Sequence, residues 1–67
     1  MLNVTVNGES QTVKPGSTVA DLLLVLKLNS RALAVEINCE LKPRDVHQVT
    51  IINEGDVLEI VTLVGGG

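Results

Sequence analysis

The stretch Val57-Leu58-Glu59-Ile60-Val61-Thr62-Leu63-Val64 is almost continuously apolar and runs directly into Gly65-Gly66-Gly67. A strand covered on both faces needs such a run, so residues 57–63 are expected at the centre of a sheet. The glycines have no Cβ to pack and much conformational entropy to lose, so they add nothing to a strand that only closes a sheet. They do form a narrow thread that can enter another protein's active site. We therefore expect the reactive group to be the terminal carboxylate of Gly67, the alternative being a frayed end without function.

The chain opens with the pattern of a β-hairpin. Leu2, Val4 and Val6 alternate with polar residues, which is the period of a half-buried strand. Asn7-Gly8 suits a tight turn, because both residue types tolerate positive φ. Residues 11–13 are expected to form the returning strand, so the hairpin should occupy about the first twelve residues.

A helix is expected from about Val19 to Leu28. Thr18 and Asp21 form a T-x-x-D start signal, in which the threonine caps free N–H groups and the aspartate sits in the positive first turn. Apolar residues recur at helical spacing on one face, at Val19, Leu22, Leu23 and Leu26. Leu24 and Val25 lie off that face. They are either covered by a second neighbour or, as we expect, tolerated as exposed apolar residues.

The second half of the chain contains short segments separated by turn residues. We expect a strand at 33–37, a turn at 38–40, a short strand from Leu41, a helical turn at 43–47, a short apolar segment at 49–52 and a turn at 53–56. A hairpin, a helix and later strands form a two-layer α+β domain, with one helix packed across a mixed sheet of four to five strands. A right-handed crossover places the last strand parallel to the first. This is the β-grasp, or ubiquitin-like, fold, with a domain at 1–64 and a flexible tail at 65–67.

Composition excludes several classes of function. The 67 residues carry a net charge of −3 and no aromatic residue, which disfavours binding to nucleic acid. One cysteine excludes an internal disulfide and fits a reducing compartment. No segment approaches the roughly 20 apolar residues that span a bilayer. The N-terminus does not look like a signal peptide, so we expect a cytoplasmic protein that does not enter membranes.

With this order of elements and this tail, the sequence resembles the ThiS family of sulfur carriers over its whole length. The matching segments are 4–9, 18–23, 34–38, 43–44, 55–61 and 64–67. A terminal diglycine alone also occurs in other ubiquitin-like proteins. The length and the Leu-Val-Gly-Gly-Gly ending make the combination specific.

The resemblance implies a role in thiamine biosynthesis. An adenylating enzyme (ThiF) would use ATP to convert the carboxylate of Gly67 to an acyl-adenylate, and sulfur from a cysteine desulfurase relay would replace AMP to leave a thiocarboxylate. Thiazole synthase (ThiG) would then take the sulfur. Gly65 and Gly66 would thread into the partner. The chain itself would be a co-substrate and not an enzyme, with no cofactor of its own.

Strand parity predicts a docking surface for these partners. If Leu58 and Ile60 point into the core, alternate residues of the last strand project from the opposite face of the sheet. The residues expected there are Ala34, Glu36, Glu59, Val61 and Leu63. An apolar spot rimmed by carboxylates suits a partner interface. The alternative is that a neighbouring loop covers it.

Cys39 and His47 are the other side chains that could take part in chemistry. Cys39 could carry a persulfide, but no basic neighbour favours its thiolate and Glu40 disfavours it, so we expect a passive turn residue. His47 could act with Asp45 or Glu36 as a base or a metal ligand. A single histidine without a second ligand or a nucleophile motif is weak evidence. We expect a solvated loop histidine and no metal site.

Two further functions stay open. The small subunit of molybdopterin synthase carries a similar thiocarboxylate, although such chains are typically longer, with aromatic and proline residues before the diglycine. A ubiquitin-type modifier or interaction module is the other possibility, and it would need lysine targets about which the sequence is silent.

Overall fold

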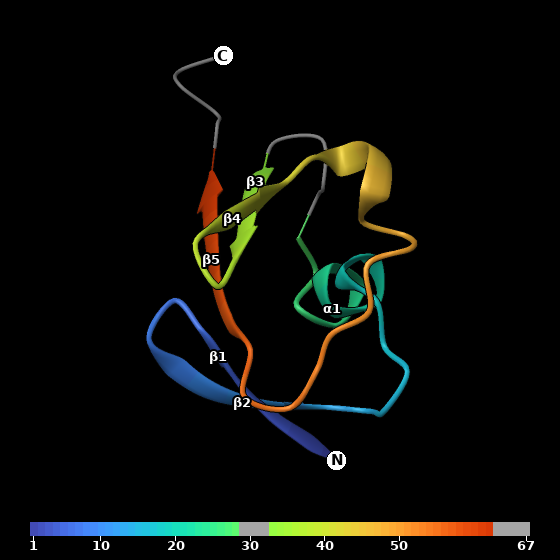
Figure 1. Ribbon diagram of the computed structural model, residues 1–67, viewed down its shortest axis with the longest axis vertical. Coiled ribbons are helices and arrows are strands. Elements are labelled where there is room, and N and C mark those ends of the chain that lie inside the picture. The colour runs from blue at the N-terminus through green and yellow to red at the C-terminus, as the bar shows by residue number, and fades with distance from the viewer. Residues whose placement is uncertain (29–32, 63–67) are drawn as a thin grey trace.

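The central strand of the protein is β5 (Val57–Thr62), as the apolar stretch predicted. A computed structural model of the chain describes residues 1–28 and 33–62. Its five strands form one mixed sheet in the order β2-β1-β5-β3-β4, with α1 against one face (Figure 1). The other elements are β1 (Leu2–Val6), β2 (Glu9–Val13), α1 (Val19–Val25), β3 (Leu33–Ile37), β4 (Glu40–Lys42) and the 3₁₀ turn η2 (Arg44–Val46). This is the expected β-grasp arrangement.

Each neighbour of β5 runs in a different direction. β1 lies parallel to it, with Thr5 opposite Val57 and Val6 opposite Leu58. β3 lies antiparallel to it through five residue pairs, from Leu33 opposite Thr62 to Ile37 opposite Leu58. The parallel pairing of the first and last strands confirms the predicted crossover.

The β1–β2 hairpin forms where the sequence predicts it. Asn7 has φ of 50° and Gly8 has φ of 83°, so both turn residues are in the left-handed region. Such a turn matches the twist of the two strands it joins. β1 and β2 pair in antiparallel register from Val6 opposite Glu9 to Leu2 opposite Val13.

The core is aliphatic and lies between α1 and the sheet. Its fully enclosed members come from different parts of the chain: Val19, Leu23, Val35, Ile52 and Leu58. Thr18 caps α1 reciprocally, because its Oγ1 accepts from the Asp21 N–H at 3.1 Å while Asp21 accepts from the Thr18 N–H at 3.0 Å. The predicted capping signal is therefore confirmed.

The helix is shorter than predicted, ending at Val25 instead of Leu28. Lys27 adopts φ of 60° and closes the helix as a left-handed residue. The Leu28 N–H then donates to the Leu23 carbonyl at 2.9 Å and the Lys27 N–H donates to Leu24 at 3.0 Å. This is a Schellman motif, in which glycine is the usual left-handed residue. Leu24 and Val25 are each 76% exposed, as expected.

The segment between η2 and β5 is held by hydrogen bonds to the start of α1 and is not a strand. Residues 49–52 contribute a single bridge, between Ile51 and Thr18. Ile52 is buried and its N–H donates to the Ser17 carbonyl, whereas Val49 is exposed. The helical turn predicted for 43–47 is present as η2, and β4 begins at Glu40, one residue earlier than expected. No helix in the described ranges is long and apolar enough to cross a membrane.

The left-handed lysine gives a test of the helix end. A residue with a Cβ loses about 1–2 kcal/mol in this conformation, whereas glycine loses only its extra chain entropy of about 0.5–1 kcal/mol. Lys27→Gly should therefore raise the free energy of unfolding by about 0.5–1 kcal/mol in urea titrations. Lys14→Gly is the matched control, because Lys14 does not have positive φ. It should lower the free energy, and equal effects of the two changes would contradict this account.

Candidate functional site

The outer face of the sheet, away from α1, brings together the described residues of the predicted docking surface. Leu58 is fully buried and Ile60 packs against the core, so the alternate residues of β5 project outward. Val61 is 55% exposed and pairs with Ala34 across the β3–β5 ladder. Glu36 and Glu59 form the next outward pair along that ladder, and both are exposed.

The remaining predicted site residues lie outside the described residues. These are Leu63 of the docking surface and the tail residues Gly65, Gly66 and Gly67. Their roles stay predictions. What the structure describes is the strand from which they follow, since β5 ends at Thr62.

Two further apolar residues enlarge this face and were missed from the sequence. Leu41 of β4 pairs with Glu36 and is 59% exposed, and Val57 of β5 is 44% exposed. Parity along β5 could have found Val57, because it alternates with Glu59. The direction of the Leu41 side chain depends on the register between β3 and β4, and the local sequence around Leu41 does not predict that register. We call the whole set the outer-face patch; it consists of Ala34, Glu36, Leu41, Val57, Glu59 and Val61.

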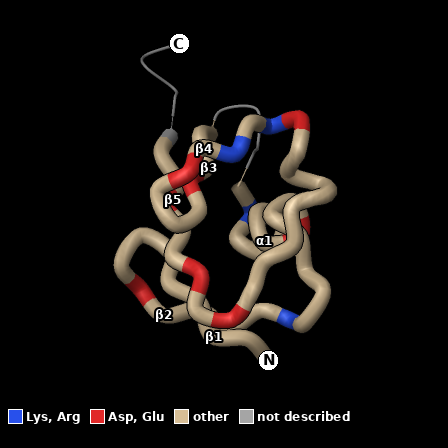
Figure 2. Tube along the Cα trace, in the orientation of Figure 1, with Lys and Arg blue, Asp and Glu red and all other residues tan. Residues whose placement is uncertain are grey.

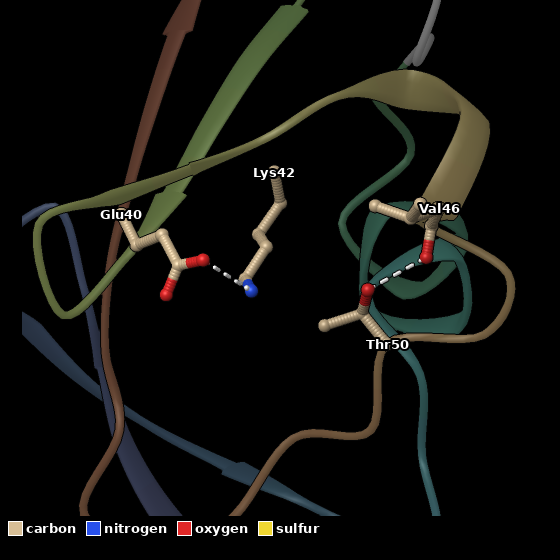
Figure 3. A network of polar contacts seen from close by, with 4 residues as sticks. All are labelled: Glu40, Lys42, Val46 and Thr50. Carbon is tan, nitrogen blue, oxygen red and sulfur yellow. Dashed lines mark hydrogen bonds and ion pairs between the residues drawn. The ribbon is translucent and has the colours of Figure 1, made fainter.

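The outer-face patch contains two like charges directly opposite each other. Opposed residues in neighbouring strands have Cβ atoms about 4.5–5.5 Å apart, and like charges in that position destabilise a sheet. Within the described ranges the only ion pair joins Lys42 Nζ to Glu40 Oε2, at 3.2 Å (Figure 3). It does not reach the Glu36–Glu59 pair, because Glu40 and Lys42 alternate with Leu41 and project from the other side of β4.

Charge is unevenly distributed around this site. Acidic segments gather along β3, β4 and β5, whereas the nearby basic segments belong to the end of β4 and to η2 (Figure 2). With a net charge of −3 for the chain, the outer-face patch is an apolar surface with an acidic centre. Such a surface complements a partner that offers apolar side chains and a cation.

Two asparagine side chains hold β5 in place. On the β1 side, Asn7 Oδ1 accepts from the Ile60 N–H at 2.7 Å and Asn7 Nδ2 donates to the Ile60 carbonyl at 3.2 Å. At the start of β5, Asn38 Oδ1 accepts from the Val57 N–H at 3.0 Å and the Asn38 N–H donates to the Val57 carbonyl at 2.8 Å. Asn38 Nδ2 also donates to Asp56 at 3.0 Å. These bonds fix both the register and the direction of the strand that leads to the glycines.

Cys39 lies far from the end of β5 that leads to the glycines. It is exposed in the β3–β4 turn, with φ of 71°, and the preceding Asn38 contacts Val57 at the start of β5. The strand extends for roughly 17 Å from there to Thr62 at about 3.3 Å per residue. Sulfur transfer from Cys39 to Gly67 within one molecule would require the last residues to double back along all of β5. The position fits the expected passive turn residue.

The prediction for His47 was wrong, because the side chain is buried and not solvated. It is 2% exposed, and Nε2 lies 2.8 Å from the Lys42 carbonyl. Since a carbonyl can only accept, Nε2 carries the proton, and Nδ1 has no partner among the described residues. The His47 carbonyl accepts from the Ala20 N–H at 3.0 Å, so the residue joins η2 and β4 to α1. No group of three metal-ligating side chains occurs in the described ranges.

Comparisons with known proteins agree with the fold, and the family match extends through the three glycines. The model of the ThiS family matches residues 4–67. The crystal structure of the thiamine biosynthesis protein ThiS from Geobacter metallireducens superposes with a TM-score of 0.84, at 35% identity, over 98% of this chain and 100% of that one.

Two curated relatives differ in length. An uncharacterized protein, ycf40, from Porphyra purpurea is 38% identical over 66 residues, which is 98% of this chain and 93% of that protein. A thiazole synthase from Paramagnetospirillum magneticum is 39% identical over 66 residues. That alignment covers 98% of this chain but only 20% of the synthase, so the chain spans about a fifth of that relative's length.

The paired carboxylates give a prediction about stability. Glu59→Lys replaces a repulsive pair with an attractive one and should raise the free energy of unfolding by about 0.5 kcal/mol at low ionic strength. Salt should reduce the gain, because the pair is exposed. Glu9→Lys is the control with the same change in net charge, since Glu9 is exposed on β2 and faces Val6 across the hairpin. Equal stabilisation by both variants would mean that net charge, and not this pair, is responsible.

Proposed function

The chain belongs to the ThiS family of small sulfur carriers, and from this premise we propose that it carries sulfur as a thiocarboxylate on Gly67. The observation that carries the proposal is the extent of the family match, which runs through the three glycines to residue 67. The structure adds that the preceding strand is the central one of the sheet, with β1 on one side and β3 on the other. A chain end of three residues without side chains, carried close to a central strand, suits delivery of a carboxylate into a narrow site.

The chemistry requires activation by another protein. A carboxylate is a poor electrophile until one of its oxygens becomes part of a good leaving group. In the proposed reaction a carboxylate oxygen of Gly67 attacks the α-phosphorus of ATP, which releases pyrophosphate and forms an acyl-adenylate. A persulfide sulfur then attacks the acyl carbon and AMP leaves. A second thiol then attacks the donor's sulfur in the resulting acyl disulfide, forms a disulfide with the donor and releases the thiocarboxylate, which donates its sulfur to the thiazole ring.

The proposed partners follow from this sequence of steps. They are an adenylating enzyme of the ThiF type, a cysteine desulfurase relay and a thiazole synthase of the ThiG type. Support for the last comes from the Paramagnetospirillum relative, in which a segment 39% identical to this chain occurs within a much longer protein named thiazole synthase. ATP would bind to the activating enzyme. This chain would act as a co-substrate, with its glycines threaded into each partner in turn.

The outer-face patch is the proposed docking surface for the activating enzyme. Its residues lie on β5 and on the neighbouring strands β3 and β4, so a protein bound there would contact the strand that leads to the tail. Its apolar members are separated by the Glu36–Glu59 pair, whose repulsion a cationic group of the partner would relieve. Binding of such a partner would therefore remove a repulsion that destabilises the isolated domain.

The proposed function predicts a change in the mass of the modified chain. Incubation with an adenylating enzyme of this type, ATP, a persulfide donor and an excess of thiol should replace one oxygen of the chain by one sulfur, as measured by intact-mass spectrometry. Tandem fragmentation should place the sulfur on Gly67. Adducts joined to lysine residues of other proteins would instead indicate a ubiquitin-type modifier.

An extended chain provides the control for that measurement. One leucine added after Gly67 moves the carboxylate beyond the glycine thread and adds a side chain where none fits. This variant should fold with an unchanged free energy of unfolding and gain no sulfur. Sulfur incorporation into the extended chain would contradict the role of Gly67.

The docking surface is tested by a charge on its apolar part. Val61→Asp should reduce kcat/KM for adenylation about tenfold or more, because it places an unpaired carboxylate in an apolar contact. The fold should persist, since Val61 is 55% exposed. Val49→Asp makes the same change at a residue that is 73% exposed and lies outside the patch, and it should leave adenylation unaffected. Adenylation of the Val61 variant at the wild-type rate would remove this surface from the proposal.

A further inference from the structure

The strand β1 ends well before β5 does, and this leaves part of β5 without a neighbour. The parallel pairing consists of Thr5 opposite Val57 and Val6 opposite Leu58. β5 then continues to Thr62. Figure 1 shows the last part of β5 with β3 on one side and no strand on the other.

Asn7 determines where this edge begins. Its side-chain amide accepts from the Ile60 N–H at 2.7 Å through Oδ1 and donates to the Ile60 carbonyl at 3.2 Å through Nδ2. The side chain therefore stands where the backbone of a further β1 residue would pair with β5. Backbone groups alternate in direction along a strand, and those of Ile60 face the β1 side. The N–H and carbonyl of Thr62 therefore face the same side. No described strand lies next to them there.

We propose that the enzyme that activates the tail adds an extended segment of its own to β5 at this edge, pairing with the backbone of Thr62. The inference rests on the proposed function. Addition of a strand to a sheet edge supplies affinity through main-chain hydrogen bonds and leaves specificity to neighbouring side chains. Those neighbours are Val61 and Glu59 of the outer-face patch, on the same strand.

The position of the edge favours an activating partner as its occupant. The chain passes from Thr62 toward the glycines, so pairing at Thr62 would align the strand with the site that receives Gly67. A second copy of this chain is a poorer occupant. Each copy has a net charge of −3 and would bring its own Glu36–Glu59 pair close to the shared edge.

The test removes one backbone N–H without changing any side chain. A synthetic chain with a backbone ester at Thr62 replaces that N–H by oxygen. It should fold normally, because this N–H faces away from β3, and circular dichroism with urea unfolding checks this. Its dissociation constant for an adenylating enzyme of the ThiF type, measured by calorimetry, should rise about tenfold. Its rate of adenylate formation at low chain concentration should fall in proportion.

The opposite edge of the sheet offers a matched control. Thr12 lies on β2 opposite Asn3, a pair flanked by Gln11 opposite Val4 and Val13 opposite Leu2. In a two-residue hairpin this register directs the Thr12 N–H away from β1, toward solvent. A backbone ester at Thr12 should leave binding and adenylation unchanged.

The outcomes separate this inference from the proposed function. If the wild-type chain is adenylated and the Thr62 ester binds as tightly as the wild type, the edge pairing is wrong and the proposed function stands. If the wild type forms dimers that the Thr62 ester does not form, the edge belongs to a second copy and the inference is overturned. If the wild type is not adenylated at all, the proposed function fails and this inference fails with it.

Discussion

β5 has a parallel neighbour on one side and an antiparallel neighbour on the other, and the rest of the structure depends on this constraint. Parallel strands cannot be joined by a tight turn, so the chain between β1 and β5 has to cross the sheet. α1 lies in that crossing and brings Val19, Leu22 and Leu23 to the core, where Leu58 is fully buried. An aliphatic domain of this size has little stability to spare. The strand that leads to the tail is therefore also the central strand of the sheet and contributes a fully buried residue to the core.

Two asparagine side chains provide hydrogen-bond partners for backbone groups of β5 that the neighbouring strands do not reach. β5 is longer than its pairing with β1, and its first residue needs a partner beyond the end of β3. Asn7 and Asn38 provide these partners with side-chain amides, which offer a donor and an acceptor as a backbone unit does. Both residues sit in hairpin turns at positive φ, which asparagine tolerates better than most residues. The same side chains therefore make the turns and anchor the central strand.

Most of the fold could be predicted from local patterns, whereas two of the three misses involve contacts between distant segments. The alternation of apolar and polar residues predicted the hairpin, and the T-x-x-D signal predicted where the helix begins. Parity along β5 predicted that Glu59 and Val61 project outward. The helix end was missed because a left-handed lysine carries no compositional signal. His47 was misplaced because its burial depends on the Lys42 carbonyl and on packing against α1. Leu41 was missed because its direction follows from the β3–β4 register.

The candidate interaction groups lie on the open edge of β5 and on one face of β3, β4 and β5, and such an exposed surface suits a carrier better than a pocket would. A carrier has to be accepted by successive partners, each with a different active site. Binding to backbone groups at an open edge and to a small apolar face requires few particular side chains of the partner, so unrelated proteins can bind there. The repulsive Glu36–Glu59 pair works in the opposite direction, because it disfavours any partner without a cation at that point. Under the proposed function, main-chain pairing at the edge of β5 would allow several different proteins to bind next to the tail. The Glu36–Glu59 pair would limit binding to those that place a cation beside it.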